Sequence, residues 1–333
     1  MKVAVFDTHQ YDRHALDAAN VRFGHELVYF ETRLNRETVA LAAGFPVVCP
    51  FVNCRLDAIT LQHLAAAGTH FVALRAAGFN GIDLNAAKTH GIAVARVPAY
   101  SPHAVAEHAF ALLLTLVRKT HRAHARIREG NFSLDGLVGF DLFGKTFGVI
   151  GAGKIGRIAA RIAHGFGCRV LLYDPYPDLA FAATIEASCV DFETILTQSD
   201  ILSLHLPLTP TSQHLIDAKA LRQMKAGSIL INTSRGGLIE TDALVIAVKS
   251  GKLGGVCLDV YELEEGVFFE NLSDTGIADD RLARLLTLPN VLITSHQGFL
   301  THEALTNIAD TTLENVRSFS AGEPLVNAVL LPN

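Results

Sequence analysis

A glycine-rich turn at residues 151–156, with the sequence GAGKIG, restricts the fold of this chain more than any other segment. An apolar run at residues 146–150 leads into the turn, and apolar residues recur at helical spacing after it. A second apolar run at residues 169–173 ends at Asp174. A glycine-rich turn alone is weak evidence, because tight loops commonly contain glycine. The complete strand–helix–strand unit with its terminal acid predicts a dinucleotide-binding site.

Each part of this unit has a physical role in such a site. Gly151 permits the tight turn, Gly153 lets the backbone approach a pyrophosphate, and Gly156 lets helix and strand pack closely. The helix N-terminus offers unpaired N–H groups and positive dipole charge to the phosphates. Asp174 can accept hydrogen bonds from the adenosine ribose hydroxyls and would repel a 2′-phosphate. We therefore expect NAD as the cofactor rather than NADP.

Short apolar strands alternate with helical segments along the whole chain. One set of candidate strands lies at residues 2–6, 26–30, 47–51, 71–74 and 92–97, and a second at residues 146–150, 169–173, 201–206, 228–232, 255–258 and 291–294. Strands that are apolar throughout are typical of parallel sheets covered on both faces. The alternation therefore predicts an α/β fold with doubly wound sheets.

Three other segments complete the predicted organisation. Residues 102–128 are predicted to form one long helix, with Ser101 as N-cap and Pro102 at the first helical position. The apolar face of this helix packs either inside the monomer or against a second subunit, and spacing does not distinguish the two. We expect an acidic surface excursion at residues 262–284 and a helix at residues 301–317.

Composition excludes several classes of protein. The chain is 50% hydrophobic and has a net charge of −5, so nothing indicates a nucleic-acid partner. Its N-terminal apolar run is shorter than a signal peptide requires, and its longest other apolar run, at residues 109–117, is shorter than the about 20 residues of a membrane span. The five cysteines form no CxxC pair, and His121 and His124 have no evident third ligand, so we expect no metal site. We therefore expect a cytoplasmic protein that does not bind membranes.

Polar residues follow the strands of the second set at their carboxyl ends, where ligands bind in open parallel sheets. Taken singly, Arg235 fits a surface loop, Asp259 a turn, Glu264 an acidic excursion and His296 a strand end. Their joint placement favours a functional role for Arg235 and His296, and leaves Glu264 open on position alone. The residues expected to bind the cofactor are Gly151, Gly153, Lys154, Ile155, Gly156, Asp174, His205, Leu206, Pro207, Ser212, Thr233, Ser234, Arg235 and Asp259.

With these residues in place, the chain resembles the D-2-hydroxyacid dehydrogenases, and within them the bacterial fermentative D-lactate dehydrogenases. The likeness extends over nearly the whole chain. It departs from many relatives at Ser295, where they carry proline, and at Gly298, where alanine is common. The segments that carry it are FVN at 51–53, ALRAAGFN at 73–80, VPAYSP at 97–102, GKT at 144–146, INTSRG at 231–236, DVYE at 259–262 and HQGFLT at 296–301.

The resemblance implies a catalytic set and a reaction. Arg235 would bind the substrate carboxylate, Glu264 would orient the ring of His296, and His296 would act as acid and base in hydride transfer with NADH. Asp259 would position the cofactor or Arg235. The implied reaction is the reversible reduction of pyruvate to D-lactate; the alternatives are another small 2-keto acid, or an NAD-sensing binding protein. The implied substrate-binding residues are Ala77, Gly78, Tyr100, Arg235, His296 and Phe299.

The resemblance also implies a domain organisation. A flavodoxin-like substrate domain would comprise residues 1–99 plus 300–333, and a Rossmann cofactor domain residues 100–299. The active site would lie in the cleft between them. The family further implies a homo-oligomer, a dimer or tetramer, formed through the cofactor domains.

Overall fold

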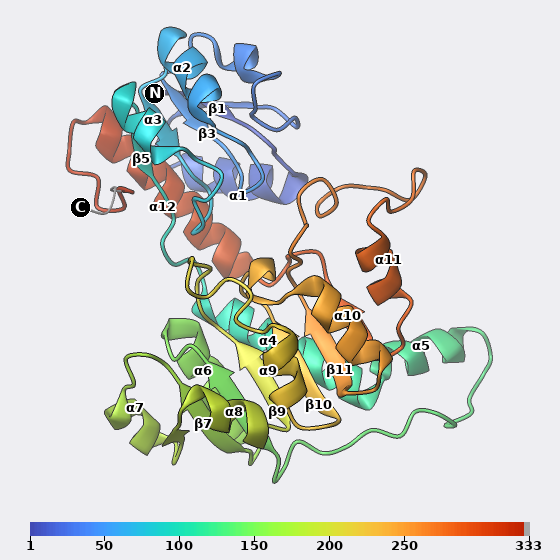
Figure 1. Cartoon of the computed structure of the whole chain (residues 1–333). Coiled ribbons are helices and arrows are strands. Elements are labelled where there is room, and N and C mark those ends of the chain that lie inside the picture. The colour runs from blue at the N-terminus through green and yellow to red at the C-terminus, as the bar shows by residue number, and fades with distance from the viewer. Residues whose placement is uncertain (330–333) are drawn as a thin grey trace. The chain divides into compact units, whose positions relative to one another are not determined.

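The computed structural model describes residues 1–329 and divides into two compact units (Figure 1). The first unit is Met1–Ser101 with Phe299–Asn333, and the second is Pro102–Gly298. Residues 330–333, which the predicted substrate domain includes, lie outside the described residues. Each unit has its own parallel sheet with helices on both faces.

The first unit contains a five-stranded parallel sheet of strand order β2-β1-β3-β4-β5. This is the order of flavodoxin-like doubly wound sheets. Helices α1 and α12 cover one face, while η1, α2 and α3 cover the other. The elements are β1 (Lys2–Val5), α1 (Gln10–Asn20), β2 (Glu26–Tyr29), η1 (Val39–Ala42), β3 (Val47–Cys49), α2 (Ala58–Ala66), β4 (Phe71–Ala73), α3 (Leu84–Thr89), β5 (Ala93–Ala95) and α12 (His302–Ser320).

The second unit contains a seven-stranded parallel sheet of order β12-β11-β10-β9-β6-β7-β8. Its first six strands in sequence follow the order of dinucleotide-binding sheets, with a topological switch between β6 and β9. The strands are β6 (Thr146–Ile150), β7 (Arg169–Tyr173), β8 (Ser188–Cys189), β9 (Ile201–Leu204), β10 (Ser228–Asn232), β11 (Leu253–Leu258) and β12 (Val291–Ile293). The predicted fold class, two doubly wound α/β sheets, is therefore confirmed.

Helices cover both faces of this second sheet. One face packs against α4 (Pro102–Arg118), α6 (Lys154–Gly165) and α7 (Leu179–Thr184). The other face packs against α8 (Phe192–Gln198), α9 (Ala218–Gln223), α10 (Thr241–Lys249) and α11 (Asp280–Leu286). The strands are buried on both sides, which explains why their sequences are apolar throughout.

The prediction of one helix over residues 102–128 was wrong. Helix α4 ends at Arg118, and α5 (Thr120–Arg128) begins after Lys119, which has a left-handed φ of 53°. The segment that follows α5 folds back onto this junction: Lys119 Nζ donates to Gly136 O at 2.9 Å, and a Cβ at Gly139 would lie 2.2 Å from Val117 O. Helix α4 buries its apolar face in the core of the unit, whereas α5 has no buried residue.

The acidic excursion is shorter than predicted, because α11 begins inside it. Leu282 and Leu285 of α11 are buried, and Phe268 within the excursion is also buried in the same core. The short edge strand β8 was not predicted, since its two residues carry no apolar run. Within residues 1–329, no helix is long and apolar enough to cross a membrane.

Candidate active site

The three glycines of the turn after β6 have different surroundings. Gly151 has a φ of 92°, and a Cβ there would lie 2.4 Å from His205 O. A Cβ at Gly156 would lie 1.9 Å from Gly151 O, so turn and helix approach too closely for any other residue. A Cβ at Gly153 would meet no atom of residues 1–329 within 4 Å. Protein packing therefore accounts for Gly151 and Gly156, whereas at Gly153 it leaves open space in which a ligand could approach the backbone.

The helix that follows the turn is open at its N-terminus. Gly153 is the N-cap of α6 and supplies no side-chain hydrogen bond to the first N–H groups. These N–H groups and the helix dipole are suited to bind a phosphate. The turn and the helix end thus fit the pyrophosphate of a dinucleotide.

Asp174 lies directly after β7, beside the glycine turn. Its Oδ2 accepts a hydrogen bond from Ala152 N at 2.8 Å, and its Oδ1 accepts one from Tyr176 N at 2.9 Å. A carboxylate can accept about four hydrogen bonds, so capacity remains for ribose hydroxyls. The two backbone bonds fix the orientation of the acid relative to the turn.

Two buried polar atoms at the same sheet edge have no hydrogen-bond partner within the described chain. They are Thr233 Oγ1, after β10, and His205 Nδ1, after β9. Burial lowers the pKa of His205 to about 4, so the ring is neutral. Buried polar atoms are rarely left unpaired in native proteins, so a bound ligand would satisfy them. These atoms, with Gly153, show that the residues present fit a dinucleotide.

Other residues predicted to bind the cofactor shape the loops. Ser212 Oγ donates to Pro207 O at 2.8 Å and closes the loop after β9. Ser234 Oγ donates to Leu204 O at 2.7 Å and ties the loop after β10 to β9. The remaining predicted residues also lie in or directly after the turn and these strand ends: Lys154 and Ile155 open α6, and Leu206 follows β9.

The structure brings His296 and Glu264 together. His296 Nδ1 lies 3.0 Å from Glu264 Oε1, with 19% and 25% of the two side chains exposed. Glu264 therefore fixes one ring nitrogen of the histidine and leaves Nε2 as the nitrogen available to a substrate. The position of Glu264 along the chain did not decide whether this residue has a functional role. Its contact with His296 is the observation that favours one.

Arg235 lies in the loop after β10, and buried Asn232 holds that loop. Asn232 Nδ2 donates to Arg235 O at 2.9 Å, and Asn232 Oδ1 accepts from Ser234 N at 3.0 Å. Arg235 Nη1 donates to Ser234 O at 2.6 Å, which leaves other guanidinium donors for a ligand. Strands β10, β11 and β12 are neighbours in the sheet, so the loops bearing Arg235, Glu264 and His296 follow adjacent strands.

Asp259, which was expected to position the cofactor or Arg235, contacts residues of α4 and of the loop after β12. Its carboxylate accepts from the hydroxyl of Thr294 and from backbone N–H groups of residues 297 and 298, and its Oδ1 lies 3.2 Å from His108 Nε2. Burial raises the pKa of Asp259, but hydrogen bonds from His108 and Thr294 outweigh it and hold the pKa below its usual range. The acid therefore holds the loop that carries His296. It makes no bond to Arg235.

Sequence analysis missed His108 and Thr294. A signal for His108 was available: it lies between Val105 and Leu112 at helical spacing, on the apolar face of α4. A histidine on a buried helix face needs a partner. By contrast, His121 and His124 are exposed on α5, and no cluster of three metal-binding side chains occurs in residues 1–329.

The first unit holds the other predicted substrate residues. The N–H groups of Ala77 and Gly78, after β4, donate no hydrogen bond within the described residues, so both can bind an anion. The rings of Tyr100, Phe51 and Tyr11 lie 6.3, 6.1 and 6.4 Å from that of Phe299. Tyr11 is an addition to the predicted set, and burial raises its pKa.

Comparison with known proteins gives the family. The family model described as "D-isomer specific 2-hydroxyacid dehydrogenase, NAD binding domain" matches residues 110–298, which confirms the predicted cofactor. The chain is 48% identical to the D-lactate dehydrogenase of Escherichia coli, over 99% of this chain and 100% of that one. It is 49% identical to 2-hydroxyacid dehydrogenase homolog 1 of Schizosaccharomyces pombe, over 96% of this chain and 97% of that one.

Solved structures with similar folds belong to proteins of the same family. The apo structure of the Escherichia coli D-lactate dehydrogenase has a TM-score of 0.91 at 47% identity and covers 99% of this chain and 100% of that one. A D-lactate dehydrogenase with NAD+ from Lactobacillus jensenii has a TM-score of 0.83 at 32% identity, with the same coverage of both chains. The chain therefore belongs to the family of D-isomer specific 2-hydroxyacid dehydrogenases.

Proposed function

We propose that the protein reduces pyruvate to D-lactate with NADH, in a reversible reaction. The observation that carries the proposal is the bonded pair His296–Glu264, on the same sheet edge as the glycine turn. Relatives that share most of the chain are named D-lactate dehydrogenase. The overall change is balanced: the keto carbon gains a hydride, the keto oxygen gains a proton, and NADH becomes NAD+.

The protein orients the reactants and handles the proton. NADH, when bound, supplies the hydride. His296 donates the proton from Nε2 to the keto oxygen, since Nδ1 is bonded to Glu264. Glu264 fixes the ring orientation through its hydrogen bond to Nδ1. In the oxidative direction the same nitrogen accepts the hydroxyl proton.

Arg235 binds the substrate carboxylate in this proposal. Its planar guanidinium matches a carboxylate in a two-bond geometry that lysine cannot provide. Ala77 and Gly78, whose backbone N–H groups donate no hydrogen bond within the described residues, are proposed as further substrate-binding residues. The aromatic rings grouped around Phe299 are proposed to contact the substrate side chain, which would favour a small apolar group.

A panel of 2-keto acids tests the substrate. The purified protein is assayed for NADH oxidation with pyruvate, a branched-chain 2-keto acid, an aromatic one and a phosphorylated one. We expect the highest kcat/KM with pyruvate. A higher kcat/KM with any of the others would assign the chain to a different substrate within its family. Oxidation with none of them would favour an NAD-binding protein without dehydrogenase activity.

Asp174 is expected to set the preference for NADH over NADPH. We expect the wild-type kcat/KM to favour NADH by at least about 100-fold, because a carboxylate beside a 2′-phosphate costs several kcal/mol. Asp174→Asn removes the charge and should lower that preference by about 10-fold or more. Asp178→Asn is the matched control, since asparagine still caps α7 and the same charge is lost. An unchanged ratio in Asp174→Asn would contradict the assigned role.

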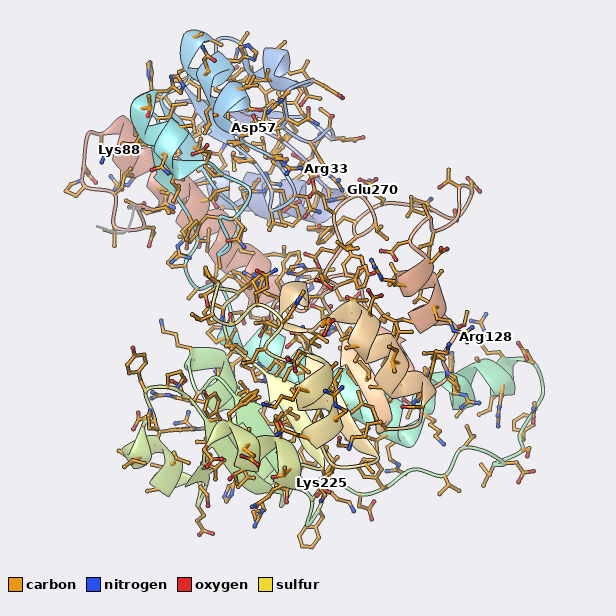
Figure 2. The ribbon with its side chains drawn as sticks, in the orientation of Figure 1. Arg33, Asp57, Lys88, Arg128, Lys225 and Glu270 are labelled. Atoms are coloured by element: carbon orange, nitrogen blue, oxygen red, sulfur yellow. The ribbon has the colours of Figure 1, made fainter. Side chains whose placement is uncertain are left out.

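We also infer a homo-oligomer, formed through α5 and the segment of residues 130–143, here called the arm. Figure 1 shows α5 and the arm extending from the second unit, and Figure 2 shows Arg128 at the end of α5. Phe132, Leu134 and Val138 in the arm are 74%, 79% and 84% exposed. Clustered exposed apolar side chains mark interaction surfaces. A second copy of the chain is the proposed partner.

The oligomer is tested by a double substitution in the arm. Leu134→Asp with Val138→Asp should convert the oligomer into a monomer in light scattering coupled to size exclusion. Val21→Asp is the control, because Val21 is equally exposed, at 86%, and lies outside the arm. A monomeric wild-type protein would refute the oligomer, and an unchanged mass in the arm variant would refute the arm as its interface.

We also propose that the protein is cytoplasmic, because all five of its cysteines are free thiols.

A further inference from the structure

The catalytic histidine has an unfavourable backbone conformation. His296 has a φ of 50°, in the left-handed region that residues other than glycine adopt only in a small minority of cases. Such a conformation is strained and persists only where its surroundings impose it. The direction in which the imidazole points depends on this conformation. The contacts that impose it are therefore part of the active site.

Asp259 provides those contacts on both sides of His296. Its Oδ1 accepts from Gln297 N at 2.8 Å and from Thr294 Oγ1 at 2.6 Å, and its Oδ2 accepts from Gly298 N at 2.8 Å. Its backbone carbonyl accepts from His296 N at 2.7 Å. Asp259 thus holds four positions of the loop around the histidine: residues 294, 296, 297 and 298.

The loop after β12 packs closely against the Asp259 carboxylate. A Cβ at Gly298 would lie 2.9 Å from Asp259 Oδ2 and 3.5 Å from His108 Cδ2. The glycine at this position therefore lets the backbone N–H approach the carboxylate directly. A shift of the carboxylate would move the loop with it.

His108 also contacts the Asp259 carboxylate and fixes its position. Its Nε2 lies 3.0 Å from Thr294 Oγ1 and 3.2 Å from Asp259 Oδ1. The single hydroxyl hydrogen of Thr294 goes to Asp259, so the threonine oxygen accepts from His108 and Nε2 carries a hydrogen. Asp259 is 1% exposed, and a buried carboxylate is costly unless every lone pair direction is satisfied. His108 supplies the donor from α4, an element outside the strands that form the site.

We propose that His108 is a positioning residue for the dehydrogenase reaction: by donating from Nε2 to Thr294 and Asp259, it fixes the left-handed conformation of His296. This inference rests on the proposed function of His296. His108 acts through Asp259 and takes no proton from the substrate. Its required property is a hydrogen-bond donor at the place of Nε2. Glutamine can supply such a donor, and leucine cannot.

Two variants of His108 test this requirement. His108→Leu should lower kcat for 2-keto acid reduction by about 10- to 100-fold, while KM for NADH stays within about 3-fold of wild type, because the glycine turn is untouched. His108→Gln should restore kcat to within about 5-fold of wild type, since its amide nitrogen reaches the position of Nε2. His103→Leu is the matched control on the same helix, where the side chain is 71% exposed, and should leave kcat unchanged.

A second pair of variants keeps the test decisive if His108→Leu folds poorly. Thr294→Val removes the hydroxyl and keeps the shape, and should reproduce the loss of kcat, whereas Thr294→Ser should not. Combining His108→Leu with Thr294→Val should cost little more than either alone, because both act through Asp259.

The outcomes separate this inference from the proposed function. Equal kcat in wild type, His108→Leu and Thr294→Val would overturn the positioning role while leaving the reaction in place. An equal loss in His108→Gln and His108→Leu would also overturn it, because the donor would then be irrelevant. A wild-type protein without activity toward any 2-keto acid would refute the proposed function itself.

Discussion

His296→Asn is expected to lower kcat for pyruvate reduction by about 10²- to 10⁴-fold, the usual contribution of a general acid. Asparagine is the replacement of choice because it tolerates the left-handed φ of 50° observed at this position. The amide cannot transfer a proton to the keto oxygen. Steady-state NADH oxidation measures the loss, and NADH fluorescence titration should show nearly unchanged cofactor binding.

His214→Asn is the matched control for this variant. His214 also has a left-handed backbone, with a φ of 51°, and pairs with Glu262 instead of Glu264. His214→Asn makes the same chemical change at the same backbone conformation, but at a residue outside the catalytic set. We therefore expect this variant to keep most of its turnover. Near-normal turnover in His296→Asn, or an equal loss in both variants, would remove His296 from its assigned role.

Arg75→Met is expected to lower the free energy of unfolding by about 3–5 kcal/mol. Arg75 is 1% exposed and lies among the ends of three strands of the first unit. It donates to Phe6 O at 3.1 Å, to Cys49 O at 2.8 Å and to Asp7 O at 3.0 Å, and lies 3.6 Å from Asp12 Oδ2. Methionine fills the volume but removes the hydrogen bonds to the three carbonyls and the cation beside the buried Asp12 carboxylate, which keeps a hydrogen bond from His9 N.

Urea unfolding of two arginine variants tests this estimate. Arg22 forms an ion pair with Asp310 on the surface, where its side chain is 59% exposed. Arg22→Met should cost no more than about 1 kcal/mol, because exposed pairs contribute little. Combining Arg75→Met with Asp12→Asn should recover part of the loss, since the buried charge is no longer left unpaired. An equal loss in the free energy of unfolding for Arg22→Met and Arg75→Met would contradict the claim that burial makes the Arg75 contacts more stabilising.

The fold was predictable because burial on both faces leaves a clear pattern. The strands on either side of the glycine turn, β6 and β7, begin and end where the apolar runs do. The break at Lys119 was not predictable, because contacts with the distant residues Gly136 and Gly139 produce it. Local propensity carries no information about such contacts.

The placement of the candidate site residues was predictable where it depends on strand ends. Arg235 follows β10 and His296 follows β12, with β11 between them, so parallel topology alone places both residues at the same edge of the sheet. The role of Asp259 was not predictable, because the direction of its carboxylate depends on the loop after β12. His108 was missed because its partners lie over 150 positions away in sequence, with Thr294 at a separation of 186.

The configuration of the lactate formed from pyruvate and NADH tests the proposed reaction most directly. The purified protein is incubated with both, and the product is resolved by chiral chromatography while NADH oxidation is followed. We predict D-lactate alone, in a one-to-one ratio to the NADH consumed. Formation of L-lactate or of a racemate, or no NADH oxidation with pyruvate, would contradict the proposed function.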